Sequence, residues 1–339
     1  MLVGPNAQGK SNLLESVYTV AVGRSPRAGV DTEVVRFGQE RAYARAAVEG
    51  VRPSLVEVAV DRRTGEKRIK VNGVVAQRGQ LLGRLAVVLA GPDDDEMVRG
   101  APGYRRRLMD AALSQMSPSY YFNLSRYHRV VRQRNRLLKA GAGAPALAPW
   151  DTQLVELGAA LVDRRRAFVA GLAVRAGARH ATITAGDEAL NVAYLGSGVG
   201  PDPGGDARAQ LARALAARRG EERRRGTSLV GPHRDDLGFT VNGVDLKTFG
   251  SRGQQHTAAL SLRLGEVGLV RDEMGEWPVV LLDDVLADLD PGRQASLLRE
   301  MSGPQVLMTH TRVPDVPEMS VRRLTVTAGK LEGGADVRA

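Results

Sequence analysis

The first residues of the chain form a pattern of residue types suited to binding phosphate. Gly4-Pro5-Asn6-Ala7-Gln8-Gly9-Lys10-Ser11 fits the P-loop pattern G-x-x-x-x-G-K-[ST] without a mismatch. In such a loop, backbone N–H groups of a glycine-rich turn and of the helix after it face the phosphates. Lys10 is expected to reach the terminal phosphate, and Ser11 to coordinate Mg²⁺. The loop predicts a nucleotide site, although a glycine-rich segment can also be a plain turn.

Two aspartates lie almost the whole chain away, after a short apolar run. Residues 279–282 do not alternate between apolar and polar, which is typical of a strand buried on both faces of a parallel sheet. Asp283 can hold the Mg²⁺ whose other protein ligand is Ser11. Asp284 is placed to orient or deprotonate the attacking water. Each aspartate alone would suit the polar end of a strand, but together with the P-loop the pair predicts hydrolysis.

A third segment narrows the class of nucleotide site. Ser251-Arg252-Gly253-Gln254 precedes a helical stretch over 256–270, and Ser251 is a good N-cap residue. This segment resembles the signature motif of ABC-type ATPases, in which the signature of one protomer contacts the terminal phosphate held by the P-loop of another. Residues 287–291 resemble the D-loop of that class. Residues 306–310 resemble its last strand, which ends in a switch histidine, here His310.

The order of these motifs predicts an α/β fold with two lobes. Residues 1–92 are expected to contain the P-loop, its helix and strands, with a hairpin turn at Asn72-Gly73. Residues 93–225 show mainly helical spacing, and strand character returns from 229. Because Asp283 must meet the P-loop, we expect a discontinuous ABC-type ATPase lobe (1–92 plus 226–339). A helical lobe II (93–225) is inserted in it.

Composition and charge indicate a polyanionic partner. The 339 residues include no cysteine, carry a net charge of +10, and contain no apolar stretch long enough for a membrane span, nor a signal peptide. We therefore expect a cytoplasmic protein. Residues 97–225 hold 22 Arg and Lys against 10 Asp and Glu, which accounts for the whole basic excess. Arg129, Arg132 and Arg136 share one helical face and are predicted to contact DNA, unless they form only a solvated helix face.

Taken together, the chain resembles the RecF family of bacterial DNA replication and repair ATPases, which are related to SMC proteins. The resemblance covers nearly the whole chain. Sequence motifs specific to the family occur at 88–94, 105–110, 226–236, 251–255 and 281–285. The chain departs from the family in three places. About thirty residues that normally precede the P-loop are absent, the P-loop ends in Ser11 rather than threonine, and His310 stands where many members have no histidine.

The resemblance implies an ATP-dependent DNA-binding protein of recombinational gap repair and replication-fork maintenance, acting within the SOS response. It implies recognition of single-stranded and gapped double-stranded DNA by an ATP-bound homodimer, slow DNA-stimulated hydrolysis, promotion of recombinase loading, and RecR and RecO as partners. Two alternatives stay open: a truncated, non-hydrolysing DNA-binding or scaffold protein, and an SMC-like ATPase unconnected with repair.

The short segment before the P-loop carries an expectation of its own. A P-loop is normally preceded by a strand of ~5–6 residues, and Leu2-Val3 is shorter than that. We expect Met1 to be a misassigned or internal start. The DNA upstream should encode about thirty more residues in frame, with two strand-like runs.

Overall fold

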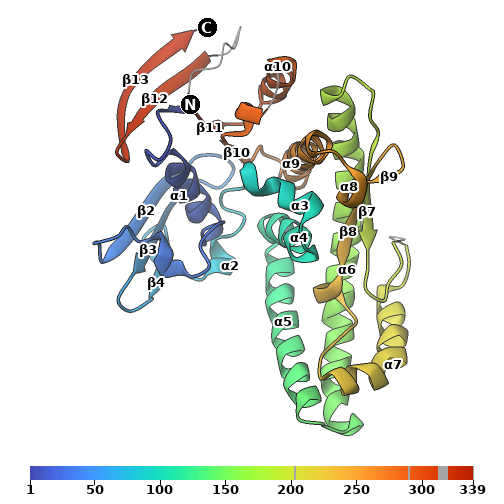
Figure 1. Ribbon diagram of the computed structural model, residues 1–339. Helices are drawn as coiled ribbons and strands as arrows, with labels where there is room; N and C mark the ends of the chain where they lie inside the picture. The colour runs from blue at the N-terminus through green and yellow to red at the C-terminus, as the bar shows by residue number, and fades with distance from the viewer. Residues whose placement is uncertain (202–203, 289–290, 312–319, 339) are drawn as a thin grey trace. The chain divides into compact units, whose positions relative to one another are not determined.

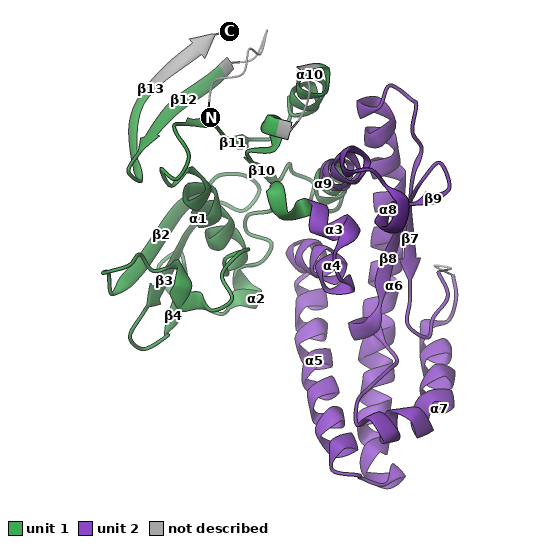
Figure 2. Cartoon of the chain, in the orientation of Figure 1, with its two compact units in different colours: residues 1–94, 266–339 green, residues 95–265 purple. Residues whose placement is uncertain are grey.

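The computed structural model of the protein describes residues 1–201, 204–288, 291–311 and 320–338 (Figure 1). These residues form two compact units, coloured in Figure 2. Unit 1 comprises 1–94 and 266–339, and unit 2 comprises 95–265. Unit 1 is therefore built from both ends of the chain, and unit 2 is the segment between them.

Unit 1 contains a six-stranded sheet in the order β13-β12-β1-β11-β10-β6. All neighbours in this sheet are parallel except β12 and β13, which form a hairpin. Its strands are β1 (Leu2–Val3), β6 (Val87–Ala90), β10 (Val279–Asp283), β11 (Val306–His310), β12 (Ser320–Thr327) and β13 (Lys330–Arg338). Although β1 has only two residues, it pairs with β11 on one side and with β12 on the other. The P-loop thus leaves the sheet from an interior strand position.

A second, antiparallel sheet completes unit 1. Its strands are β2 (Arg41–Val48), β3 (Ser54–Asp61), β4 (Lys67–Val71) and β5 (Val74–Ala76), paired in that order. The predicted turn at Asn72-Gly73 joins β4 to β5, and both residues have positive φ, as a two-residue hairpin requires. Helix α1 (Lys10–Val22) contacts strands of both sheets and places Val20 in the apolar core of the second one.

Unit 2 is dominated by helices. Helix α5 packs along α6, and α7 packs on α6 as well. The helices are α3 (Asp95–Arg99), α4 (Pro102–Met116), α5 (Pro118–Lys139), α6 (Ala144–Ile183), α7 (Ala207–Arg225) and α8 (Leu246–Phe249). Helix α9 (Arg252–Met274) begins in unit 2 and continues into unit 1. The shorter segments of unit 1 are α2 (Arg78–Leu81), α10 (Pro291–Glu300), η1 (Asp31–Val34), η2 (Pro92–Asp94) and η4 (Val285–Asp288). Across the described residues, none of the helices is long and apolar enough to cross a membrane.

The limit of unit 2 differs from the lobe boundary expected after residue 225. Strand β7 (Leu190–Leu195), which lies in a segment expected to be helical, pairs antiparallel with β8 (Asp236–Val241) over six residue pairs. Strand β8 also pairs with β9 (Val244–Asp245). The short helix η3 (Pro232–Arg234) lies just before β8 in the chain. This three-stranded sheet packs against α6, so residues 226–265 join the helical unit.

Candidate functional site

The predicted P-loop connects β1 to α1 in a strained, closed turn. Gly4 has a φ of 157°, and a Cβ there would lie 2.5 Å from the carbonyl oxygen of Val326 in β12. Gly9 has a φ of 93° and forms the N-cap of α1, where only glycine is unstrained. Gln8 is held by the β12–β13 turn: its carbonyl accepts from Gly329 N at 2.9 Å. The glycines of the pattern are therefore required by the backbone.

The loop presents hydrogen-bond donors at the N-terminus of α1. Among the described residues, the backbone N–H groups of 7–10 donate to no acceptor. The Lys10 side chain is buried and folds back over the loop, where Nζ donates to the carbonyls of Gly4 at 2.6 Å and Pro5 at 2.8 Å. Open N–H groups, a helix N-terminus and an ammonium group together favour a phosphate.

Ser11 and Asp283 meet, although 272 residues separate them in the sequence. Ser11 Oγ donates to Asp283 Oδ1 at 2.8 Å, and Thr309 Oγ1 of β11 donates to the same oxygen at 2.8 Å. Asp283 is 2% exposed and lies at the carboxyl end of β10. A hydroxyl and a carboxylate oxygen at this spacing match neighbouring ligands of an octahedral Mg²⁺, which binds oxygen at ~2.0–2.1 Å. The donor set therefore fits the predicted metal.

Asp284 is exposed and sits at a sharp change of backbone direction. Its φ is 56°, unusual for a residue other than glycine, and its N–H donates to Thr309 Oγ1 at 2.9 Å. His310 Nδ1 lies 3.4 Å from Asp284 Oδ1. The structure thus brings the predicted water-orienting carboxylate together with the predicted switch histidine. In the D-loop segment, Leu289 and Asp290 lie outside the described residues.

Sequence reasoning missed Arg27, whose guanidinium forms an ion pair with Asp283 Oδ2. The loop after α1 holds this arginine in place: Ser25 Oγ accepts the N–H of Arg27 at 3.0 Å and that of Ala28 at 2.8 Å, and bonds Glu15. Arg27 belongs to no motif, and only the return of this loop to β10 places it beside the site.

Comparison with known proteins decides the family. No protein-family model matches the chain. The DNA replication and repair protein RecF of Symbiobacterium thermophilum is 44% identical over 325 residues, covering 93% of this chain and 86% of that protein. RecF of Chloroflexus aurantiacus is 39% identical over 367 residues, covering 98% and 93%. The chain belongs to the RecF family.

Solved structures agree with this membership. A structure described as the recombination mediator protein RecF-ATP in the RecFOR pathway matches with a TM-score of 0.89 and 33% identity, over 98% of this chain and 90% of that one. The Smc head domain of Pyrococcus furiosus matches with a TM-score of 0.55 and 13% identity, over 99% and 89%, which concerns the fold alone. The predicted ABC-type α/β fold is confirmed.

The signature segment of this RecF-family chain begins α9 in unit 2. Ser251 Oγ accepts the N–H of Gln254 at 3.2 Å, and Gln254 Oε1 accepts the N–H of Ser251 at 3.0 Å, which forms a capping box. Helix α9 therefore starts four residues before the predicted 256. Ser251, Arg252 and Gly253 are exposed. A Cβ on Gly253 would meet nothing closer than Ser251 Oγ at 4.0 Å, so packing within the chain does not require this glycine.

The basic excess of unit 2 divides into buried and exposed arginines. Arg105, Arg134, Arg165 and Arg166 are 1–2% exposed. All four pair with carboxylates: Arg105 with Asp236, Arg134 with Asp151 and Glu222, Arg165 with Asp110 and Asp235, and Arg166 with Asp163. Part of the charge is therefore used inside the fold, where a buried charge must be paired.

The arginines predicted to contact DNA belong to the exposed group. Arg129, Arg132 and Arg136 are all exposed on α5, at three- and four-residue spacing. This geometry places three positive charges on one accessible helix face, and DNA contact by them stays a prediction.

The family-specific segment at 231–236 has a structural role. His233 Nδ1 lies 2.7 Å from the hydroxyl of Tyr127, and Nε2 lies 3.2 Å from the carbonyl of Ser228. Asp235 is fully buried and accepts from Arg165, Tyr194 and the N–H of Ser197. Burial lowers the pKa of His233 to about 4. This network joins η3 to α5 and α6.

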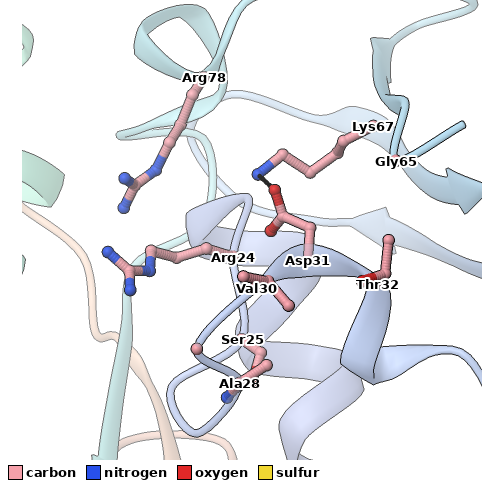
Figure 3. A pocket seen from close by; sticks show the side chains of 10 residues that line it. Arg24, Ser25, Ala28, Val30, Asp31, Thr32, Gly65, Lys67 and Arg78 are labelled. Atoms are coloured by element: carbon pink, nitrogen blue, oxygen red, sulfur yellow. Dashed lines mark hydrogen bonds and ion pairs between the residues drawn. The ribbon is translucent and has the colours of Figure 1, made fainter. Parts of the chain in front are cut away.

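Unit 1 also contains a polar pocket of about 530 Å³ beside the loop after α1 (Figure 3). Arg24, Lys67 and Arg78 line it, together with a single acidic residue, Asp31. Lys67 Nζ is paired with Asp31 at 2.7 Å, and Arg78 Nε donates to the carbonyl of Val22 at 2.7 Å. The guanidinium groups of Arg24 and Arg78 point to the same side of the pocket (Figure 3). The charge balance of this pocket favours an anion.

Proposed function

We propose that the protein is an ATP-dependent DNA-binding ATPase of recombinational gap repair and replication-fork maintenance. The observation that best supports this proposal is the hydrogen bond between Ser11 and Asp283. It joins the P-loop to the strand end proposed to bind magnesium, in a RecF-family chain. Gly4, Pro5, Asn6, Ala7, Gln8 and Gly9 would surround the phosphates with backbone groups.

Each side chain of the site has a role in this proposal. Lys10 stabilises the terminal phosphate, and Ser11 with Asp283 holds Mg²⁺, which would neutralise charge on the phosphate oxygens when bound. Asp284 orients or deprotonates the attacking water, and His310, 3.4 Å from Asp284 Oδ1, holds that carboxylate. Arg27 balances the charge of Asp283 in the absence of nucleotide.

We further propose that the active form is an ATP-bound homodimer. The chain has one P-loop and one signature, so two copies would form two composite sites related by a twofold axis. The exposure of Ser251, Arg252 and Gly253 supports this arrangement, since these residues are available to a phosphate on another protomer. Gln254 completes the signature. Hydrolysis should be slow and DNA-stimulated, so that the lifetime of the bound ATP sets how long the dimer persists.

The DNA partner in this proposal is single-stranded or gapped double-stranded DNA. Arg129, Arg132 and Arg136 supply phosphate contacts, which carry affinity rather than base specificity. The similarity to a recombination mediator of the RecFOR pathway supports RecR and RecO as partners and recombinase loading as the outcome. Such a protein would act on the chromosome, in the cytoplasm and during the SOS response.

Two variants test the proposal. Lys10→Ala should abolish ATP-dependent dimerisation in sedimentation experiments, whereas Lys247→Ala, at an exposed lysine of α8, should not. Asp284→Asn should trap an ATP-bound dimer, because losing a water-orienting carboxylate slows hydrolysis while the phosphate contacts remain. If Asp284→Asn hydrolyses ATP as fast as the parent, Asp284 is not the catalytic residue.

Two simpler measurements separate the alternatives. A chain that binds DNA but not ATP at equilibrium would be the non-hydrolysing scaffold. A chain that hydrolyses ATP but binds blunt and gapped duplex equally would be an SMC-like ATPase unconnected with repair.

A further inference from the structure

A partly buried polar link joins the signature to the end of the long helix α6. Gln254 Nε2 donates to Glu188 Oε1 at 2.9 Å, and Glu188 Oε2 lies 3.0 Å from His180 Nε2. Glu188 stands in the turn between α6 and β7, and His180 lies in the last turn of α6. The start of α9 is therefore tied to α6 through one carboxylate.

The inner end of this link is fixed by hydrogen bonds. His180 and Ser261 are both fully buried, and His180 Nδ1 lies 3.2 Å from Ser261 Oγ. The Ser261 hydroxyl donates its only hydrogen to the carbonyl of Thr257 at 2.7 Å, so it accepts from His180 Nδ1. Glu188, when ionised, can only accept, so His180 Nε2 must donate as well. His180 Nε2 therefore donates to Glu188 Oε2 and orients that carboxylate.

Helix capping does not explain the use of glutamine at 254. The capping box uses Gln254 Oε1, which accepts from Ser251 N, and a glutamate serves that purpose equally well. The amide nitrogen is the part that glutamate lacks, and this nitrogen contacts Glu188. Both ends of the Gln254 amide are therefore occupied, which leaves the side chain one orientation.

We propose that Glu188, oriented by His180, is a positioning residue for the signature. It holds Gln254, and through the capping box it sets where Ser251 and Gly253 are presented to the terminal phosphate on the partner protomer. This inference rests on the proposed homodimer. It adds a residue outside every motif recognised in the sequence.

An exchange of the two side chains tests the link. Gln254→Glu keeps the capping oxygen but faces Glu188 with a second carboxylate, so ATP-dependent dimerisation should weaken about tenfold or more, the usual scale for losing a hydrogen bond to a charged group. Monomer affinity for ATP should not change. The double variant Gln254→Glu with Glu188→Gln restores an amide–carboxylate pair, and dimerisation should return to near the parent value.

A second pair of variants covers the case in which Gln254→Glu does not fold. Glu188→Gln alone keeps one acceptor oxygen for Gln254 and should dimerise better than Glu188→Ala, which keeps none. Asp187→Ala, at the exposed neighbour in the same turn, is the matched control. The melting temperature of each variant identifies any general loss of structure.

The outcomes are distinguishable. Normal dimerisation by Gln254→Glu or by Glu188→Ala would overturn the proposal. Failure of the double variant to recover would also overturn it, because the added charge would then act directly on the phosphate. If Ser251→Arg also dimerised normally, the composite-site function itself would be wrong.

Discussion

His233 gives a test of the polar network that joins η3 to the long helices of unit 2. Its ring is largely enclosed, and burial, with the positive charges of Arg234 and Arg106, lowers its pKa to about 4. The neutral ring donates from Nε2 to Ser228 and accepts at Nδ1 from Tyr127. Protonation would put a second donor against the Tyr127 hydroxyl and place a charge in a poorly solvated position.

The sign of the pH effect follows from this lowered pKa. In the unfolded chain His233 has its ordinary pKa of 6.5 and takes up a proton near that pH. In the folded chain its pKa is about 4, so the ring stays neutral until the pH falls to that value. Between these values the unfolded state binds more protons, so stability falls as pH falls, and the change is complete below pH 4. At ~1.4 kcal/mol per pKa unit, and allowing for the part of the ring that solvent reaches, the loss by pH 4.5 is about 2 kcal/mol.

Denaturant unfolding of the parent and of His233→Gln at pH 8 and pH 4.5 measures this loss. The glutamine amide can replace the Nε2–H donor, so the variant should fold, yet it cannot titrate. The parent should lose about 2 kcal/mol more than the variant between the two pH values, while all other titrating groups cancel in the difference. Equal losses, or a His233 proton resonance that titrates near pH 6.5, would refute the assignment of a buried neutral ring.

Three further predictions concern function. Ser251→Arg should bind ATP normally as a monomer but fail to dimerise with ATP in sedimentation; a normal dimer would contradict the composite site. Arg27→Ala removes the cation from Asp283 and should raise the apparent affinity for Mg²⁺ in the absence of ATP, as measured by calorimetry; lower affinity would show that the arginine organises the site. Replacing the exposed arginines of α5 with Ala should weaken DNA binding and reduce its log–log salt slope by roughly one unit per lost phosphate contact. An unchanged slope would assign them to a solvated helix face. The triple variant is Arg129→Ala, Arg132→Ala and Arg136→Ala.

Local sequence was sufficient where chemistry depends on a short, contiguous pattern. The P-loop could be predicted because its glycines satisfy backbone requirements that eight consecutive residues define. Asp283 could be placed at a strand end because an uninterrupted apolar run before it is typical of a buried parallel strand. The N-cap role of Ser251 could be predicted too, since a cap residue acts within its own turn, but apolar spacing predicted the helix only from 256, four residues too late.

The lobe boundary and the division of the arginines depended on contacts that no local pattern contains. Strand β7 is short, lies among helices, and pairs with β8 from beyond the expected boundary, so the sheet determines which unit residues 226–265 join. Arg134 and Arg129 contribute equally to the net charge of the sequence. In the structure, however, Arg134 is buried against carboxylates and Arg129 is exposed. Exposure depends on what packs over a residue, and the packing partners here lie tens of residues away.

The sequence by itself determined the class of the protein and predicted the residues proposed to bind phosphate and metal, because those residues act through their own backbone conformation or their fixed chemistry. Only the tertiary structure decided which other side chains serve them. Arg27 reaches Asp283 across 256 residues, and Glu188 reaches Gln254 across 66. Neither belongs to a motif, since an ion pair or a hydrogen bond needs only proximity, and the fold creates that proximity.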